Sequence, residues 1–332
     1  MTVALLLLGY ATALSSLGAR VLKRCAWTAR SPRLGIVAWL ALTGSVVASV
    51  TLAGFALALP TVRLSGNLAD LLHSCAMALR AQYATPGGAA AGATGAVLGL
   101  AVVARCLYCL IRALVQAVRA RARQHQALVM VGRRMAGFDA IVVPHDQPAV
   151  YCLPGRGRRI VVTSGALTSL NDRQLGAALA HEHAHLAERH DLLLAWVISL
   201  ARAFPRVPLF TTAENEVARL VEMLADDIAT RHTNRLVLAD ALLALAGART
   251  PVAALGAGGT TAACRVRRLL DPARPLGLLG RASSSVSAVA LFAVPVLLFS
   301  GPAVAAMGMN YCPDSAEAAR VLICAPGQSS CR

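Results

Sequence analysis

The sequence predicts an integral membrane protein, mainly α-helical with four transmembrane helices, that carries a cytosolic α+β domain containing a small sheet. The first observation is composition: the 332 residues are 57% hydrophobic and 14% charged, which is too apolar for an ordinary soluble domain. The second is four apolar stretches long enough to cross a bilayer. The third is a central region where short β-rich runs precede helical patterns.

The four predicted transmembrane helices cover residues 3–17, 34–59, 88–111 and 282–309. The first could be a signal peptide, but its basic end follows the apolar run instead of preceding it, so we expect a retained helix. Pro295 and Pro302 interrupt the last, which a span tolerates where neighbouring helices satisfy the freed backbone. We therefore expect a membrane region over 1–111, a cytosolic domain over 112–281, a fourth span over 282–309 and a short extracytoplasmic tail over 310–332.

The basic residues indicate how the chain is oriented. The net charge is +16 and Lys23 is the only lysine. The connection between the first two predicted spans holds Arg20, Lys23, Arg24, Arg30 and Arg33, whereas the next connection holds only Arg63 and Arg80. By the positive-inside rule, both termini are extracytoplasmic and 112–281 is cytosolic, in a bacterial plasma membrane. Because the basic residues flank apolar runs, we expect a lipid bilayer as partner and no direct binding of nucleic acid.

Cysteines also divide between the two sides of this topology. Four of them fall on the oxidising side, namely Cys75, Cys312, Cys324 and Cys331. An even number permits disulfides there, and the sequence leaves open whether any form.

A histidine cluster lies in the stretch LAHEHAHLAERHD, residues 179–191. His181, Glu182 and His185 fit the pattern HExxH. On a helix the two histidines lie one turn apart on one face, so both can bind one Zn²⁺ ion. Glu182 beside the first ligand can act as the base that takes a proton from the attacking water. His183 and His190 are expected to be surface or packing residues, because a continuous helix points His183 away and carries His190 roughly 13 Å along its axis.

A catalytic zinc site needs a third protein ligand and an open position. Glu222 and Asp226 lie four apart in an otherwise apolar helical stretch, so they share a face. We expect Glu222 to complete a His-His-Glu site and Asp226 to accept a hydrogen bond from a ligand imidazole.

The combination of HExxH and the later stretch EMLADDIA, with its ExxAD pattern, resembles the gluzincin membrane metallopeptidases, including HtpX-type proteases. The four spans, the short gap between the motifs and HLAERHD are more similar to the BlaR/MecR-type beta-lactam-sensor branch. The resemblance covers about residues 127–246. It implies zinc binding by His181, His185 and Glu222, a catalytic base at Glu182, and a gluzincin-type protease fold for the cytosolic domain.

One feature of the sensor branch is absent from this sequence. BlaR/MecR receptors carry a penicillin-binding sensor after the fourth span, whose nucleophile lies in an SxxK motif. Lys23, the only lysine, has Arg20 three residues before it. We therefore expect no direct acylation by beta-lactams.

A β-rich strand is expected upstream of the histidines, over Arg159, Ile160, Val161, Val162 and Thr163. It follows a turn that includes Pro154 and Gly155, as the second strand of a hairpin. In this kind of fold such a strand runs beside the zinc and pairs with an extended substrate, although an ordinary hairpin fits the same pattern.

Together these features predict a membrane zinc endopeptidase acting on a protein or peptide at the cytosolic side. Signal transduction, by cleavage of a transcriptional repressor or of the chain itself, is the expected role. Membrane-protein quality control is an alternative. A non-catalytic receptor or scaffold with a structural zinc is an alternative of another class. The sequence does not indicate the substrate, the stimulus or the oligomeric state.

Overall fold

The computed structural model describes residues 2–58, 77, 87–135, 138, 140–155, 159–247, 258–271 and 276–308. The chain divides into two compact units. One comprises Met1–Gly9, Ala48–Leu100 and Ala293–Arg332, and the other comprises Tyr10–Val47 and Ala101–Phe292. The four cysteines assigned to the oxidising side, together with Arg63, Arg80 and the tail 310–332, lie outside the described residues.

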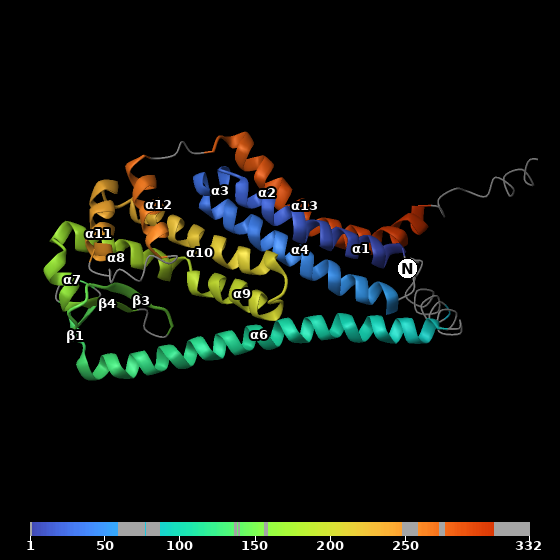
Figure 1. Cartoon of the computed structure of the whole chain (residues 1–332), viewed down its shortest axis with the longest axis horizontal. Coiled ribbons are helices and arrows are strands. Elements are labelled where there is room, and N and C mark those ends of the chain that lie inside the picture. Colours follow the sequence, from blue (N-terminus) through green and yellow to red (C-terminus); the bar gives the residue numbers. More distant parts are fainter. Residues whose placement is uncertain are drawn as a thin grey trace, which may run out of the picture. The chain divides into compact units, whose positions relative to one another are not determined.

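The first unit is formed by parts of four long helices (Figure 1). They are α1 (Thr2–Ala13), α4 (Pro32–Ala58), α6 (Gly88–Val131) and α13 (Leu278–Gly308). One buried cluster in this unit comprises Ala4, Leu7 and Ala53, against which Leu298 and Phe299 pack. Within this unit α4 and α6 approach closely at glycines: a Cβ on Gly54 would lie 2.7 Å from the Gly95 carbonyl oxygen. Small residues of this kind let helix backbones pack directly in a membrane.

Four helices among the described residues are long and apolar enough to cross a membrane. They are Thr2–Arg24, Pro32–Ala58, Gly88–Gln126 and Leu278–Ser300. The helices that begin at Thr2, Pro32 and Gly88 start close to the expected spans 3–17, 34–59 and 88–111. Helix α6, however, continues to Val131, beyond the predicted end at Ile111. The second half of α6 carries charged residues but is rich in Ala, Arg and Gln, which favour helix, so the helix continues past the point where the sequence becomes polar. The number of spans, the domain boundaries and the sidedness stay predictions.

The second unit holds the sheet and a set of shorter helices. At its N-terminal end are a π-helical turn η1 (Leu14–Gly18), α2 (Ala19–Arg24) and α3 (Trp27–Arg30). The remaining helices are α7 (Ser164–Ser169), α8 (Asp172–Ala187), α9 (His190–Ala203), α10 (Pro208–Ala229), α11 (Arg235–Gly247) and α12 (Gly258–Leu270). Helix α10 packs against both α8 and α9, and its Leu209, Leu220 and Val221 are fully buried.

The sheet is mixed and has the order β1-β2-β4-β3. Its strands are β1 (Arg133–Arg134), β2 (Ala140–Val143), β3 (Val150–Leu153) and β4 (Arg159–Thr163). The expected hairpin is present, since β3 and β4 pair antiparallel. β4 also pairs with β2 in parallel along its other edge. Its interior residues Ile160, Val161 and Val162 are buried, as expected for a central strand.

This topology corrects the substrate role expected for Arg159, Ile160, Val161, Val162 and Thr163. Both edges of β4 are occupied by neighbouring strands, so its backbone has no free groups for an added strand. The reason for the error is that the short strand β2 was not recognised, and its presence turns β4 into an interior strand. Within the described sheet, the outer edge on this side belongs to β3.

The close approach of α4 and α6 gives a first prediction. Gly54→Ala places a methyl group against a backbone carbonyl, which cannot move without displacing the helix, and should lower the free energy of unfolding by about 1–3 kcal/mol. Gly9→Ala is the control, because a Cβ there has no atom within 4 Å. Thermal unfolding in detergent measures both. Equal stability of the two variants would contradict the close packing.

Candidate metal centre

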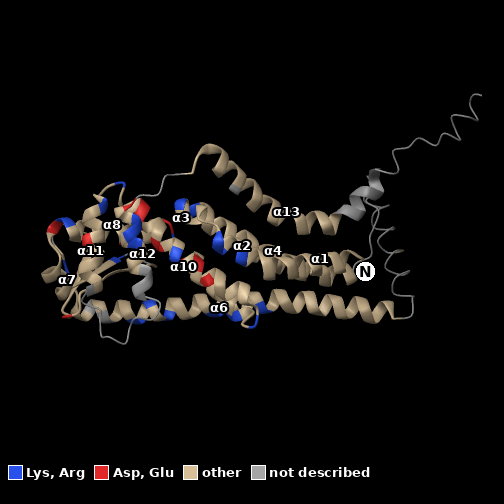
Figure 2. Cartoon of the chain, turned by 45° about the horizontal axis from the view of Figure 1, so that its top comes forward, with Lys and Arg blue, Asp and Glu red and all other residues tan. Residues whose placement is uncertain are grey.

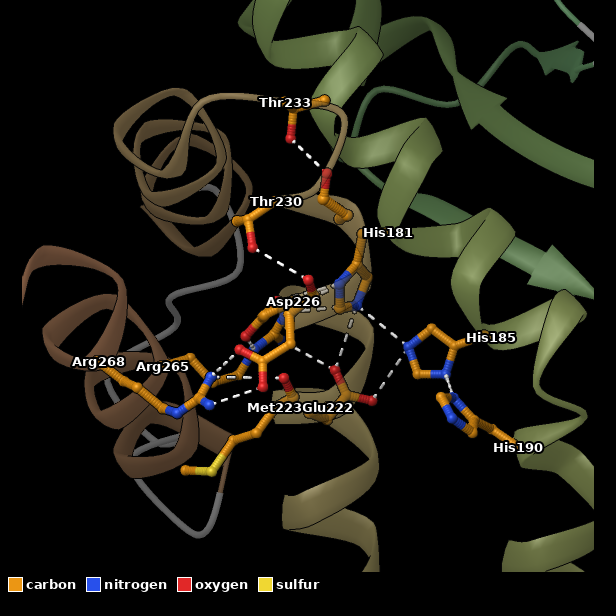
Figure 3. A network of polar contacts seen from close by, with 12 residues as sticks. His181, His185, His190, Glu222, Met223, Asp226, Thr230, Thr233, Arg265 and Arg268 are labelled. Atoms are coloured by element: carbon orange, nitrogen blue, oxygen red, sulfur yellow. Dashed lines mark hydrogen bonds and ion pairs between the residues drawn. The ribbon is translucent and has the colours of Figure 1, made fainter. Parts of the chain in front are cut away.

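Helix α8 carries the HExxH residues and is fixed at both ends. Asn171 caps its first turn in a reciprocal arrangement with Gln174: the Asn171 side chain accepts from the Gln174 backbone N–H and the Gln174 side chain accepts from the Asn171 backbone N–H. Such a cap satisfies two backbone donors that a helix start leaves unpaired. Leu175 and Leu179 bury the sheet-facing side. His181 and His185 project from α8 toward α10, as Figure 3 shows.

His181, His185 and Glu222 come together as expected and can hold a metal ion. The offered ligand atoms all lie within 4.8 Å of one another. Nε2 of His181 is 3.1 Å from Nε2 of His185, and these nitrogens lie 3.5 and 3.6 Å from the two Glu222 carboxylate oxygens. His181 is buried, and the side chains of His185 and Glu222 are partly buried. The two imidazoles and the carboxylate thus form a compact triangle.

Asp226 lies one turn after Glu222 on α10 and faces the same cluster. Its Oδ1 is 3.0 Å from Nδ1 of His181, on the side of the ring opposite Nε2. A neutral His181 that donates its Nδ1 proton to Asp226 keeps the Nε2 lone pair directed at the triangle. The neighbouring Asp227 faces elsewhere and pairs with Arg268 of α12.

Arg265 of α12 is a member of the site that the sequence did not reveal. Its side chain is almost fully buried and donates to Asp226 through Nε at 2.8 Å and through a terminal nitrogen at 2.6 Å. The other terminal nitrogen donates to Glu222 at 2.8 Å. A buried carboxylate is strongly destabilising unless it is paired, and Arg265 supplies that pairing for Asp226. The positive charge also fixes the rotamers of both α10 carboxylates.

His190 is the second missed residue, and its predicted position was wrong. Arg189 adopts a left-handed conformation, with φ 53°, which ends α8 and starts α9 at His190. The chain therefore turns back, and Nδ1 of His190 lies 3.0 Å from Nδ1 of His185. His190 is 1% exposed. His183, in contrast, is exposed as expected.

Glu182 lies beside the triangle and contacts the sheet. Its Oε2 accepts a hydrogen bond of 2.9 Å from the backbone N–H of Cys152 on β3. Burial raises the pKa of the Glu182 carboxyl above its ordinary value of 4.5, although the nearby His181 acts in the opposite direction. A carboxylate with a raised pKa is a stronger base than an exposed glutamate. β3 thus orients the carboxylate that stands next to the ligand cluster.

The imidazoles and carboxylates of the triangle shift one another's pKa values. Burial opposes protonation of His181, but hydrogen bonds to Asp226 and Glu222 outweigh it and raise the pKa to about 9. Burial and the adjacent His181 lower the pKa of His185 to about 4. Contacts with His181 and Arg265 overcome burial and hold the pKa values of Glu222 and Asp226 at about 2. Near pH 7 the imidazole pair therefore holds one proton.

His190 gives the second prediction. His190→Leu removes the partner of His185 Nδ1 and should weaken binding of a divalent metal by about 10–100-fold, because the imidazole loses its orientation. His183→Leu is a matched control on the exposed face of α8 and should leave the affinity unchanged. Competition against a chromogenic chelator measures both, with thermal unfolding of the metal-free variants as a check of folding. Equal affinities in the two variants would rule out this role for His190.

Comparison with known proteins agrees with this geometry. The family model described as peptidase family M48 matches residues 115–205. The matched segment contains His181, Glu182 and His185 and ends before α10, which supplies Glu222 and Asp226. No curated protein and no solved structure matches the chain. The M48 match and the His-His-Glu cluster together support a metallopeptidase, of a family that is typically zinc-dependent.

Proposed function

We propose that the chain is a membrane zinc endopeptidase that hydrolyses peptide bonds at the cytosolic side. The observation that carries the proposal is the triangle of His181, His185 and Glu222 with Glu182 beside it. The M48 match supports the peptidase class independently. Helices apolar enough to cross a membrane support membrane association.

The donor set fits zinc in chemistry and in spacing. Two imidazoles and one carboxylate are a typical ligand set of a catalytic zinc, which keeps its fourth position open. Ligand atoms 2.0–2.1 Å from a tetrahedral ion are about 3.3 Å from one another. The two Nε2 atoms are 3.1 Å apart, and they lie 3.5 and 3.6 Å from different oxygens of the Glu222 carboxylate. With one ligand atom from each residue, all three atoms lie within 4.8 Å of one another, so the three side chains are close enough to share one ion.

Each residue then has a specific role in hydrolysis. A zinc ion held by His181, His185 and Glu222 would supply Lewis-acid chemistry, which would polarise the scissile carbonyl and lower the pKa of the attacking water. Glu182 takes a proton from that water and later delivers it to the leaving nitrogen. The Cys152 N–H holds Glu182 in place at 2.9 Å. Asp226 keeps the Nδ1 proton on His181, and Arg265 keeps Asp226 ionised.

The substrate strand is proposed to add to the outer edge of β3. The Thr163 N–H donates to the Ala149 carbonyl, so in the antiparallel pair the backbone groups of Val150 and Cys152 point away from β4. The bond from Cys152 to Glu182 agrees with this direction. An extended peptide on this edge would pass beside the proposed base, bound mainly through its backbone. Such binding tolerates varied sequences.

For the biological role we propose signalling in the manner of the BlaR/MecR-type branch, by cleavage of a repressor-like protein or of the chain itself. The motif HLAERHD and the ExxAD stretch on α10 support this assignment. Quality control of membrane proteins is the enzymatic alternative. A scaffold with a structural zinc is disfavoured because a structural site has no need of a base beside its ligands.

The base gives the third prediction. Glu182→Gln keeps the size of the side chain but cannot take up a proton, so kcat/KM should fall by about 100-fold or more at unchanged zinc content. Glu214→Gln on α10 removes the same charge away from the site and is the control. Cleavage of an unfolded model protein and metal analysis of the same samples provide the measurement. Full activity of Glu182→Gln at equal zinc loading would refute the mechanism.

The imidazole pair gives the fourth prediction. Because the pKa of His181 is about 9 and that of His185 about 4, the metal-free site holds one proton between pH 5 and pH 8. Zinc uptake must release it, so the apparent affinity should rise by about tenfold per pH unit in this window. Calorimetry in buffers of different ionisation enthalpy counts the released protons. Release of close to zero protons on zinc binding, or a zinc affinity independent of pH, would contradict the assignment of one proton to the imidazole pair.

A further inference from the structure

A second site lies on the opposite side of α10 from the histidines and is lined by arginines. This cavity, of about 640 Å³, is formed by the ends of α3 and α4, by α10 and the turn after it, and by α11, α12 and α13. Its charged lining is Arg30, Arg33, Arg231, Arg235, Arg268 and Asp227. Figure 2 shows ribbon segments coloured for Lys and Arg at α3 and near α12. We call this cavity the arginine pocket.

The charges of the arginine pocket are not balanced within the described residues. Asp227 neutralises Arg268 through two contacts, of 2.7 and 2.8 Å. Arg33 faces Glu188 in an exposed pair, which contributes little. Arg30, Arg231 and Arg235 have no ionic partner in the part of the chain that the structure describes. Several guanidinium groups converging on one cavity favour a bound anion, and their paired N–H donors match phosphate oxygens.

An apolar groove adjoins the arginine pocket. It also measures about 640 Å³, and Ser285 of α13 lines both cavities. Its walls are one face of α4 beyond Leu34, the start of α9 and the middle of α13, with Val37, Leu40, Trp196 and Phe292 among the lining side chains. All of these residues belong to the second unit. A charged cavity that shares a wall with an apolar one suits an amphiphile, which has a charged head and an apolar tail.

The placement along the helices matches a membrane boundary. The arginine pocket includes Pro32, Arg33 and Leu34, the first residues of α4, and α4 is apolar enough to cross a bilayer. The groove follows α4 toward its apolar interior, at Val37, Leu40 and Gly44. Along this helix the cationic cavity therefore lies at the end of the candidate span, where lipid phosphates are found, and the groove lies at the depth of acyl chains.

We propose that the arginine pocket and the adjoining groove form one binding site for an anionic phospholipid. The phosphodiester headgroup lies among Arg30, Arg231 and Arg235, and one acyl chain occupies the groove between α4, α9 and α13. The lipid then bridges α3, the turn after α10 and the start of α11. The bound lipid lies close to the metal centre, because the opposite side of α10 carries Glu222 and Asp226.

The test is lipid binding to the purified full-length chain in neutral detergent, followed by native mass spectrometry and by thermal unfolding. Phosphatidylglycerol should bind and raise the unfolding temperature, whereas phosphatidylcholine should bind at least about tenfold more weakly. The double variant Arg231→Gln/Arg235→Gln should lose about tenfold or more in phosphatidylglycerol affinity. The double variant Arg119→Gln/Arg123→Gln is the control, because it removes the same charge from exposed positions of α6 that line neither cavity.

Two further arms separate the possible sources of the phosphate. Inorganic phosphate and glycerol phosphate, which have no acyl chain, should neither bind nor compete at millimolar concentration. Competition by either would overturn the lipid proposal in favour of a small soluble anion. Equal losses of phosphatidylglycerol affinity in the two double variants would show that the effect comes from general surface charge. That result would also overturn the lipid proposal. Metal content, measured in every variant, separates these outcomes from damage to the zinc site.

Discussion

The buried carboxylate of Asp226, held between His181 and Arg265, is the interaction on which the centre depends. Asp226 is 1% exposed, so its charge is tolerable only with partners on both sides. It joins three helices, since His181 comes from α8, Asp226 from α10 and Arg265 from α12. Removing one partner from a buried pair of this kind costs about 3–5 kcal/mol. The same contacts that stabilise the packing of these helices also direct Nε2 of His181 toward His185 and Glu222.

The residues of this centre that were predictable from the sequence are those whose arrangement depends on short spacings along one helix. The two histidines of HExxH lie one helical turn apart, and so do Glu222 and Asp226. Helix geometry therefore places the members of each pair on one face. The scarcity of acidic residues in an apolar chain then left few alternatives for a third ligand.

The missed residues depend on features without a local signal. The turn that brings His190 back to His185 rests on a left-handed Arg189, where glycine or asparagine would have marked a helix end. Arg265 follows α10 at a long distance in sequence and resembles the membrane-flanking arginines in composition. The central position of β4 depends on β2, a short strand with parallel pairing, and such non-local pairing cannot be read from alternation alone. The errors concerned a short strand that was not recognised and the way in which the elements meet.

The most direct measurement of the central claim is X-ray absorption spectroscopy at the zinc edge on the zinc-loaded chain, with Glu222→Gln beside it. One zinc per chain, with two imidazole nitrogens and carboxylate oxygen at about 2.0–2.2 Å and an altered oxygen shell in the variant, is the predicted result. Sulfur scattering at about 2.3 Å, from cysteine ligands, would contradict it. A shell unchanged by Glu222→Gln would equally show that the metal is bound elsewhere.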